Sequence, residues 1–72
     1  MKFNTVDRKY KKLNDFIRGE MRRKKISQED MAYRLNLSQA SVSQKLNEVT
    51  EWSMREVIDV FEILGVDDVW NW

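Results

Sequence analysis

The sequence predicts an all-α fold of four main helices, and three observations carry this prediction. Apolar residues recur at spacings of three and four and do not alternate strictly, which is typical of amphipathic helices. Ser27, Ser38 and Ser53 each stand just before such a run, where a serine side chain can cap the first helical turn. The chain has 72 residues, no repeat and no Ser/Gly-rich linker. We therefore expect one domain over residues 1–72.

The first helix is expected to begin at Thr5 or Tyr10 and to end near Lys24. Gly19 lies inside it and costs up to ~1 kcal/mol relative to alanine, which the flanking packing must offset. Residues 22–25 are four consecutive cations, which suit the negative end of the helix dipole. The apolar residues of this helix share one face: Leu13, Phe16, Ile17 and Met21.

The other three helices are predicted over 28–35, 39–47 and 54–64, each starting at a serine cap with a hydrophobic staple. In a staple, the residue before the cap packs against the fourth helical residue and fixes the angle of entry. Glu56 lies three residues after Ser53 and completes a capping box. The expected staple pairs are Ile26 with Met31, Leu37 with Val42, and Trp52 with Val57.

The predicted helix ends also carry local signals. Asn36 and Gly65 can adopt the left-handed conformation that stops a helix, and Val66 is expected to fold back onto Phe61. A short fifth turn over 67–72 is left open. The residues expected to face the core are Met31, Ala32 and Leu35 in the second helix, and Met54, Val57, Ile58, Phe61 and Leu64 in the fourth.

The composition excludes several classes of function. The chain has no Cys and no His, so disulfides and Ser–His or Cys–His nucleophiles are excluded and a zinc site is not expected. No acid–base constellation is present, so we expect neither an enzyme nor a metal or cofactor. No apolar run approaches the ~18 residues of a membrane span, and no apolar segment follows the N-terminal cations as in a signal peptide. We expect a cytoplasmic binding module without a membrane partner.

A formal net charge of +1 hides a gradient along the chain. Residues 1–25 hold ten Lys/Arg against three Asp/Glu, a balance of +7. Residues 26–50 come to −1 and residues 51–72 to −5. A basic segment favours nucleic acid or another acidic partner, whereas an acidic segment favours the opposite. Composition alone does not choose between these partners.

Residues 28–47 form a candidate helix-turn-helix unit between the basic segment 1–25 and the tail 66–72. Ala32 is small where the third helix must cross close to the second. Asn36 tolerates a positive φ in the tight turn, while Leu37 and Val42 are apolar and lock the angle between the helices. All these demands are met at the required spacing.

This pattern resembles the Cro and phage-repressor helix-turn-helix family. The resemblance rests on ISQEDMA (26–32), LNLSQ (35–39) and SVS (41–43), and on WS (52–53), VI (57–58) and LGV (64–66), which resemble the helix that follows in that family. It spans about residues 13–66 and implies a compact, lambda-repressor-like DNA-binding domain of four to five helices. The size further resembles a small regulator of a temperate phage's lysogeny switch, either Cro-like or a modulator-of-repression antirepressor.

The outward face of the third helix is polar and uncharged. Glutamine can contact adenine through two hydrogen bonds, and the methyl group of Ala40 can touch thymine. The resemblance implies that bases are read by Gln39, Ala40, Ser43 and Gln44, and that phosphates are held by Gln28, Ser38, Ser41 and Asn47. The leading expectation is therefore binding of double-stranded operator DNA in the major groove, as a homodimer. The alternative for the Gln and Ser side chains is plain solvated surface.

One departure from the family raises a second hypothesis. Family members usually carry a glycine and cations after the recognition helix, but residues 47–51 hold Glu48, Glu51 and no cation. The third helix has only Lys45, beside its apolar face. Because phosphate neutralisation supplies most non-specific affinity, we expect weak DNA binding unless the cations of 1–25 reach the duplex. The alternative function is an antirepressor that binds a repressor protein, whose basic face the acids could complement: Glu48, Glu51, Glu56, Asp59 and Glu62.

The three tryptophans are expected to lie in different environments. Trp52 is expected in the core because of its staple role. Trp70 either packs back onto the core or joins Trp72 in an apolar contact with a second copy or a partner, since tryptophan is enriched at binding hot spots. The fourth-helix acids Asp59 and Glu62 also have the simpler interpretation of a solvated face.

Overall fold

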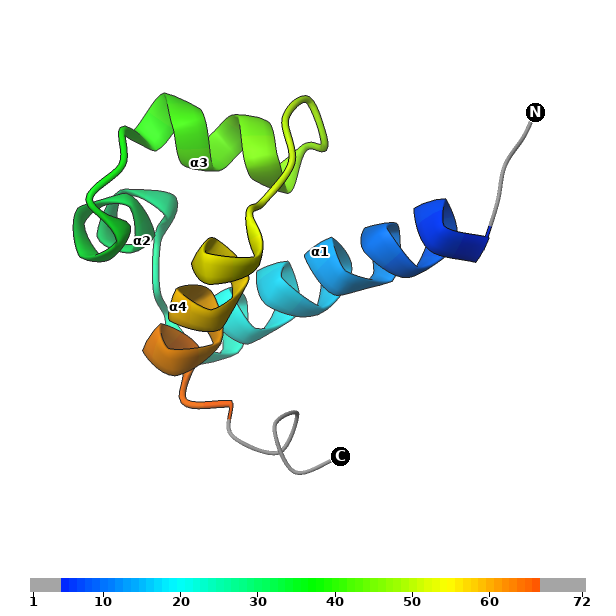
Figure 1. Ribbon diagram of the computed structural model, residues 1–72. Helices are drawn as coiled ribbons and strands as arrows, with labels where there is room; N and C mark the ends of the chain where they lie inside the picture. The colour runs from blue at the N-terminus through cyan, green and yellow to red at the C-terminus, as the bar shows by residue number, and fades with distance from the viewer. Residues whose placement is uncertain (1–4, 67–72) are drawn as a thin grey trace.

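The computed structural model describes residues 5–66, with side chains from residue 8 onward. This part of the chain is all-helical and has four helices: α1 (Thr5–Lys24), α2 (Gln28–Leu35), α3 (Gln39–Leu46) and α4 (Met54–Leu64) (Figure 1). The predicted helices are confirmed; α1 takes the earlier of its two expected starts, and α3 ends just before the predicted Asn47. The fifth turn expected over 67–72 lies outside the described residues.

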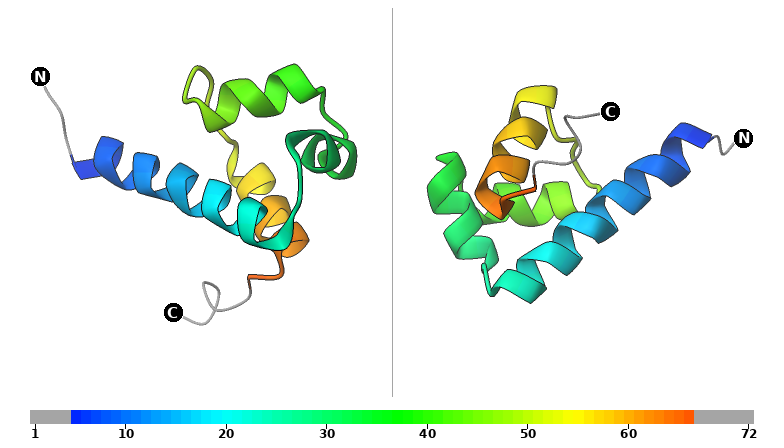
Figure 2. Two further views of the ribbon diagram at one scale, coloured as in Figure 1. Left: turned by 180° about the vertical axis from the view of Figure 1, so that it is seen from behind. Right: turned by 90° about the horizontal axis from the view of Figure 1, so that it is seen from below.

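The three shorter helices lie beside the long helix α1. α2 packs against α3, and α4 packs against both α1 and α2. Figures 1 and 2 show these helices gathered against the C-terminal half of α1, while the N-terminal end of α1 projects away from them. None of the four helices combines the length and the hydropathy that a membrane crossing requires.

The three serine caps are confirmed. Each hydroxyl oxygen accepts a hydrogen bond from the backbone N–H three residues later. The predicted capping box is present, because Glu56 Oε1 accepts from the Ser53 N–H at 2.9 Å. A second box joins Ser27 and Asp30. The cap distances are 3.0 Å from Ser27 to Asp30, 3.0 Å from Ser38 to Ser41, and 3.1 Å from Ser53 to Glu56.

All four helices end in the same backbone motif. Within two residues of each end, one residue adopts a left-handed conformation: Lys25 (φ 57°), Asn36 (φ 61°), Glu48 (φ 65°) and Gly65 (φ 71°). The next N–H then donates to the carbonyl five residues before it, which closes a Schellman motif. These bonds join Ile26 to Met21 (2.9 Å), Leu37 to Ala32 (2.9 Å), Val49 to Gln44 (2.8 Å) and Val66 to Phe61 (2.9 Å). The stops at Asn36 and Gly65 were predicted; those at Lys25 and Glu48 were not.

The core draws on every helix and on the loop before α4. Ala32 is buried in α2, with 4% of its surface exposed. Trp52 is 7% exposed, which confirms that it lies in the core. The phenyl ring of Phe16 meets that of Phe61 edge-on, with 6.0 Å between centroids. The buried apolar residues are Ile17, Met21, Met31, Ala32, Val42, Leu46, Trp52, Val60, Phe61 and Leu64.

The predicted inner face of α4 was wrong in part. Met54 and Ile58 are 73% and 40% exposed, whereas Val60 is fully buried. The buried arc of α4 is centred between Val60 and Phe61, so Met54 and Ile58 lie to one side of it. Phe16, also expected on an inner face, keeps 41% of its surface exposed despite its ring contact.

Candidate recognition surface

The third helix presents a polar face opposite its buried side. Val42 and Leu46 are buried beneath it, at 0% and 2% exposure. Gln39, Ala40 and Gln44 are exposed, and Ser43 is half-buried beside them. The four predicted base-reading residues thus lie together on α3, with the amides of Gln39 and Gln44 exposed, while the Ser43 hydroxyl oxygen accepts a hydrogen bond from the Asn47 amide at 3.4 Å.

The four predicted phosphate-holding residues are more heavily engaged within the protein. Gln28 is half-buried at the first position of α2, and the Ser38 oxygen already accepts from the N–H of half-buried Ser41. Asn47 is exposed, yet its Oδ1 accepts a hydrogen bond of 2.6 Å from Arg18.

A buried amide, Asn14, holds the C-terminal end of α3 against α1. Asn14 is 1% exposed, and its Oδ1 accepts from the indole N–H of Trp52 at 2.7 Å. Its amide nitrogen donates to the Lys45 carbonyl at 3.3 Å. The Tyr10 hydroxyl oxygen accepts from the backbone N–H of Trp52 at 2.8 Å. The sequence pattern did not single out Asn14, although an amide beside Leu13 on the inner face of a helix is itself a signal.

Arg18 binds the same end of α3. Its guanidinium donates to the Leu46 carbonyl at 2.8 Å as well as to Asn47. A cation there satisfies a carbonyl that has no partner in the helix and lies at the negative end of the dipole. Arg18 was counted among the basic residues of 1–25, but it serves the fold and does not face a partner freely.

Lys45, the only cation of α3, is held inside the protein. Its ammonium lies 3.1 Å from Glu56 Oε1 and donates to the Glu51 carbonyl at 3.0 Å. It also lies 5.8 Å from the centroid of the Trp52 ring. The Lys45 side chain is 13% exposed. Its charge is therefore neutralised locally and is withdrawn from the outer face of α3.

The electrostatics of Glu56 agree with this pairing. Partial burial raises the pKa of its carboxyl, but hydrogen bonds from Ser53 and the ammonium of Lys45 outweigh burial. The pKa of Glu56 therefore lies below its ordinary value, and the group is ionised at neutral pH. The Lys45 ammonium and the Glu56 carboxylate thus form an ion pair with 3.1 Å between nitrogen and oxygen.

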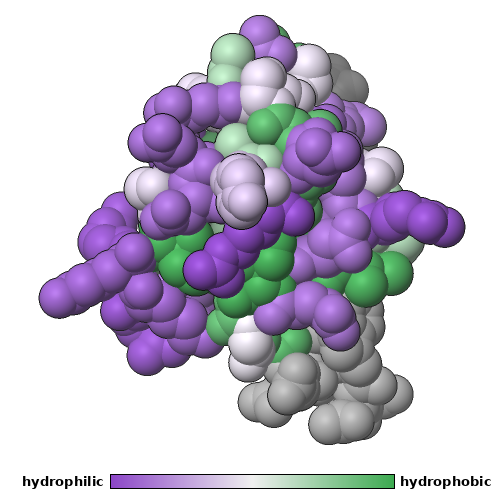
Figure 3. All heavy atoms as spheres, turned by 90° about the vertical axis from the view of Figure 1, so that its left-hand side faces the viewer, coloured by the Kyte–Doolittle hydropathy of each residue, from purple (hydrophilic) through white to green (hydrophobic). Residues whose placement is uncertain are grey.

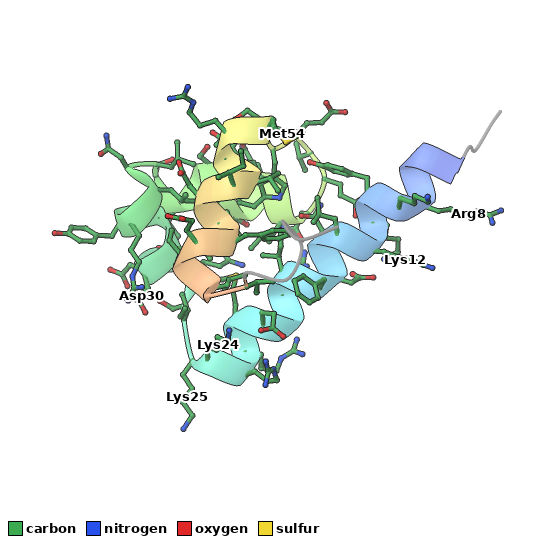
Figure 4. All side chains as sticks on the ribbon, turned by 60° about the horizontal axis from the view of Figure 1, so that its bottom comes forward. Arg8, Lys12, Lys24, Lys25, Asp30 and Met54 are labelled. Carbon is green, nitrogen blue, oxygen red and sulfur yellow. The ribbon has the colours of Figure 1, made fainter. Side chains whose placement is uncertain are left out.

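The surface that continues from α3 into the loop is acidic. Glu48 and Glu51 are both exposed, and residues 39–51 contain no cation besides Lys45. Exposed cations lie elsewhere: Figure 4 shows Arg8 and Lys12 on the projecting half of α1 and Lys25 beyond its other end. Arg34 on α2 and Arg55 in the first turn of α4 are exposed as well, so the exposed positive charge lies on the other three helices and not on α3 itself.

The side of the molecule on which α2 lies is mostly hydrophilic (Figure 3). Figure 3 shows hydrophilic side chains over most of the side on which α2 lies, with apolar groups between them.

The described residues hold no group of three or more acidic, Cys or His side chains suited to a metal ion. Trp70 and Trp72, the other predicted partner contacts, lie outside the described residues.

Comparison with known proteins adds no relative. No protein-family model, curated protein or solved structure matches the chain. The candidate surface therefore rests on its own geometry and chemistry.

Proposed function

We propose that α2, the turn at 36–38 and α3 form a helix-turn-helix of the Cro and repressor type, in a lambda-repressor-like domain that regulates transcription. The proposal draws support from the left-handed Asn36 in the turn and from the burial of Ala32 in α2, which packs against α3. It also draws support from the exposed polar row on α3. In this role the chain acts in the bacterial cytoplasm, as part of a phage lysogeny switch.

Its partner in this proposal is a DNA-binding repressor protein, whose access to DNA it blocks. The single observation that carries this choice is the pairing of Lys45 with Glu56 at 3.1 Å. Affinity for DNA comes mainly from cations that neutralise phosphates, several at a time. A face whose only cation is paired inward, beside exposed Glu48 and Glu51, repels a polyanion. The same face complements the cationic surface with which a repressor meets DNA.

Direct binding of operator DNA is the second candidate function. The exposed amides of Gln39 and Gln44 favour it, because glutamine in the major groove can recognise adenine through two hydrogen bonds. In this version the chain acts as a homodimer on paired half-sites, and α3 enters the groove. The exposed cations of α1 then supply the contacts to the DNA backbone.

One mobility-shift series separates the two candidates. It uses a phage repressor and the operator DNA that this repressor binds, each alone and together with this chain, at fixed salt. We expect the chain to leave free operator unshifted and to release operator from the repressor. If the chain alone shifts operator, and Gln44→Ala abolishes that shift, operator binding replaces the antirepressor proposal. If it neither shifts operator nor releases the repressor, both candidates fail.

A further inference from the structure

The end of α3 differs from the ends of the other three helices. After the left-handed residue, the next side chain is apolar in every case and packs against the core in three of them: Ile26, Leu37 and Val66. At the end of α3 the equivalent residue, Val49, is 71% exposed. Its N–H bonds to the carbonyl of Gln44, whose side chain is polar and exposed, so the usual apolar contact of a Schellman motif is missing.

The left-handed residue at this end is of an unfavourable type, as Lys25 is at the end of α1. Glu48 has a φ of 65°, a region that residues other than Gly, Asn and Asp seldom adopt. Its side chain is exposed, so burial does not compensate for the strain. Strained residues of this kind cluster at functional sites. Residues 48–51, which we name the 48–51 tip, therefore combine a strained residue with an exposed aliphatic side chain.

The tip is nevertheless held in place. The N–H groups of Val49 and Thr50 both donate to the Gln44 carbonyl, at 2.8 and 3.3 Å. At the other end of the tip, the Glu51 carbonyl accepts from Lys45 at 3.0 Å. A segment fixed in this way loses little conformational entropy when it binds. It also continues directly from the exposed face of α3 through Gln44.

We infer that the 48–51 tip is the docking element for the repressor protein of the proposed function, with Val49 as its apolar anchor and Glu48 as its ionic contact. The argument is charge complementarity. Glu48 and Glu51 flank Val49. The two cations bonded to this end of α3 are both engaged, Lys45 with Glu56 and Arg18 with Asn47. An aliphatic side chain between two carboxylates matches a surface of lysines and arginines that otherwise binds phosphate. This inference rests on the proposed function and adds the location of the contact.

The test compares two tip variants with two matched controls. Glu48→Gly removes the charge and the strain, and Val49→Ser removes the aliphatic group. Asp15→Asn and Met54→Ser make similar changes at exposed positions of α1 and α4. The binding probe is the same purified phage repressor as in the mobility-shift series, titrated calorimetrically with each variant of the 72-residue chain, and the melting temperature Tm is recorded in parallel.

We expect each tip variant to bind the repressor at least about tenfold more weakly, while the controls stay within about twofold of the wild type. Glu48→Gly should also raise Tm, because glycine adopts a positive φ without strain. A variant that is more stable yet binds less well cannot be explained by misfolding. Equal binding by both tip variants and the wild type overturns the inference, as does an equal loss in the controls. A wild type that does not bind the repressor overturns the proposed function instead.

Discussion

The two ends of α3 are held in different ways. At its N-terminal end, Ser38 caps the helix within its own turn, and no side chain of the described part of α1 or α4 hydrogen-bonds to residues 38–40. At its C-terminal end, Asn14 and Arg18 reach in from α1, and Glu56 from α4 binds Lys45. One end is thus fixed by polar groups from two other helices, and the other end is left open to solvent.

This difference teaches how a small domain can fix the direction of an exposed helix. A fully satisfied polar network selects one arrangement of the groups that it joins, because any other leaves buried donors unpaired. The network around Trp52 therefore fixes the C-terminal end of α3, while packing against α2 holds the rest of the helix. The exposed residues Gln39 and Ala40 then need no contacts of their own to be held in position.

Breaking the fixed end should have the largest effect. Asn14→Leu leaves the indole N–H of Trp52 without its acceptor in a buried site, and we expect a loss of about 2–3 kcal/mol in the free energy of unfolding. Urea denaturation measures it. The adjacent change Asp15→Asn, at an exposed side chain, should cost less than about 0.5 kcal/mol. Equal losses for the two variants would mean that the network does not hold α3.

Changing the open end should have an intermediate effect. Ser38→Ala removes the oxygen that accepts from the Ser41 N–H, and we expect a loss of about 1 kcal/mol, as is usual for an N-cap. The control is Ser41→Ala, one turn into α3, which leaves the cap intact. A loss above that of Asn14→Leu would reverse the comparison between the two ends.

Removing the charge of Glu56 from its pair with Lys45 should have the smallest effect on the free energy of unfolding. This effect should depend on pH. The pKa of Glu56 is lowered in the folded state, so its ionised form stabilises the fold above the ordinary pKa of glutamate. Glu56→Gln keeps a capping side chain but loses the charge. We expect the wild type to exceed it by about 0.5 kcal/mol at pH 7. Denaturation curves at several pH values should show this difference fade as the pH falls through the lowered pKa of Glu56.

Exposed Glu62 on the same helix provides the control for that measurement. Glu62→Gln should leave the stability close to that of the wild type across the same pH range. A difference between the wild type and Glu56→Gln that grows on acidification would contradict the assigned sign of the pKa shift.

The helices and their starts could be predicted because their signals are local. The caps at Ser27, Ser38 and Ser53 each act over three residues. The left-handed stops at Lys25 and Glu48 could not be predicted, since neither residue type favours that conformation and the surrounding structure imposes it. Helical spacing also predicts the direction of a buried face only approximately. This is why Met54 and Ile58 were wrongly expected to face the core.

The candidate site was predictable to the same extent. The exposure of Gln39, Ala40 and Gln44 follows from the period of one helix. The polar network does not, because its partners lie far apart in the sequence: Asn14 and Trp52 are separated by 38 positions, and Arg18 and Leu46 by 28. Which partner the surface binds stays a prediction until the experiments above are done.

The shared motif at the four helix ends has a consequence for folding kinetics. At Asn36 and Gly65 the residue type itself favours the left-handed conformation and the closing bond joins residues five apart, so α2 and α4 can end where they do before they meet another helix. The contact of Asn14 with Trp52 instead requires a long stretch of chain to close. We therefore expect the docking of that loop onto α1 to limit the folding rate, within the microsecond to millisecond range of small helical domains.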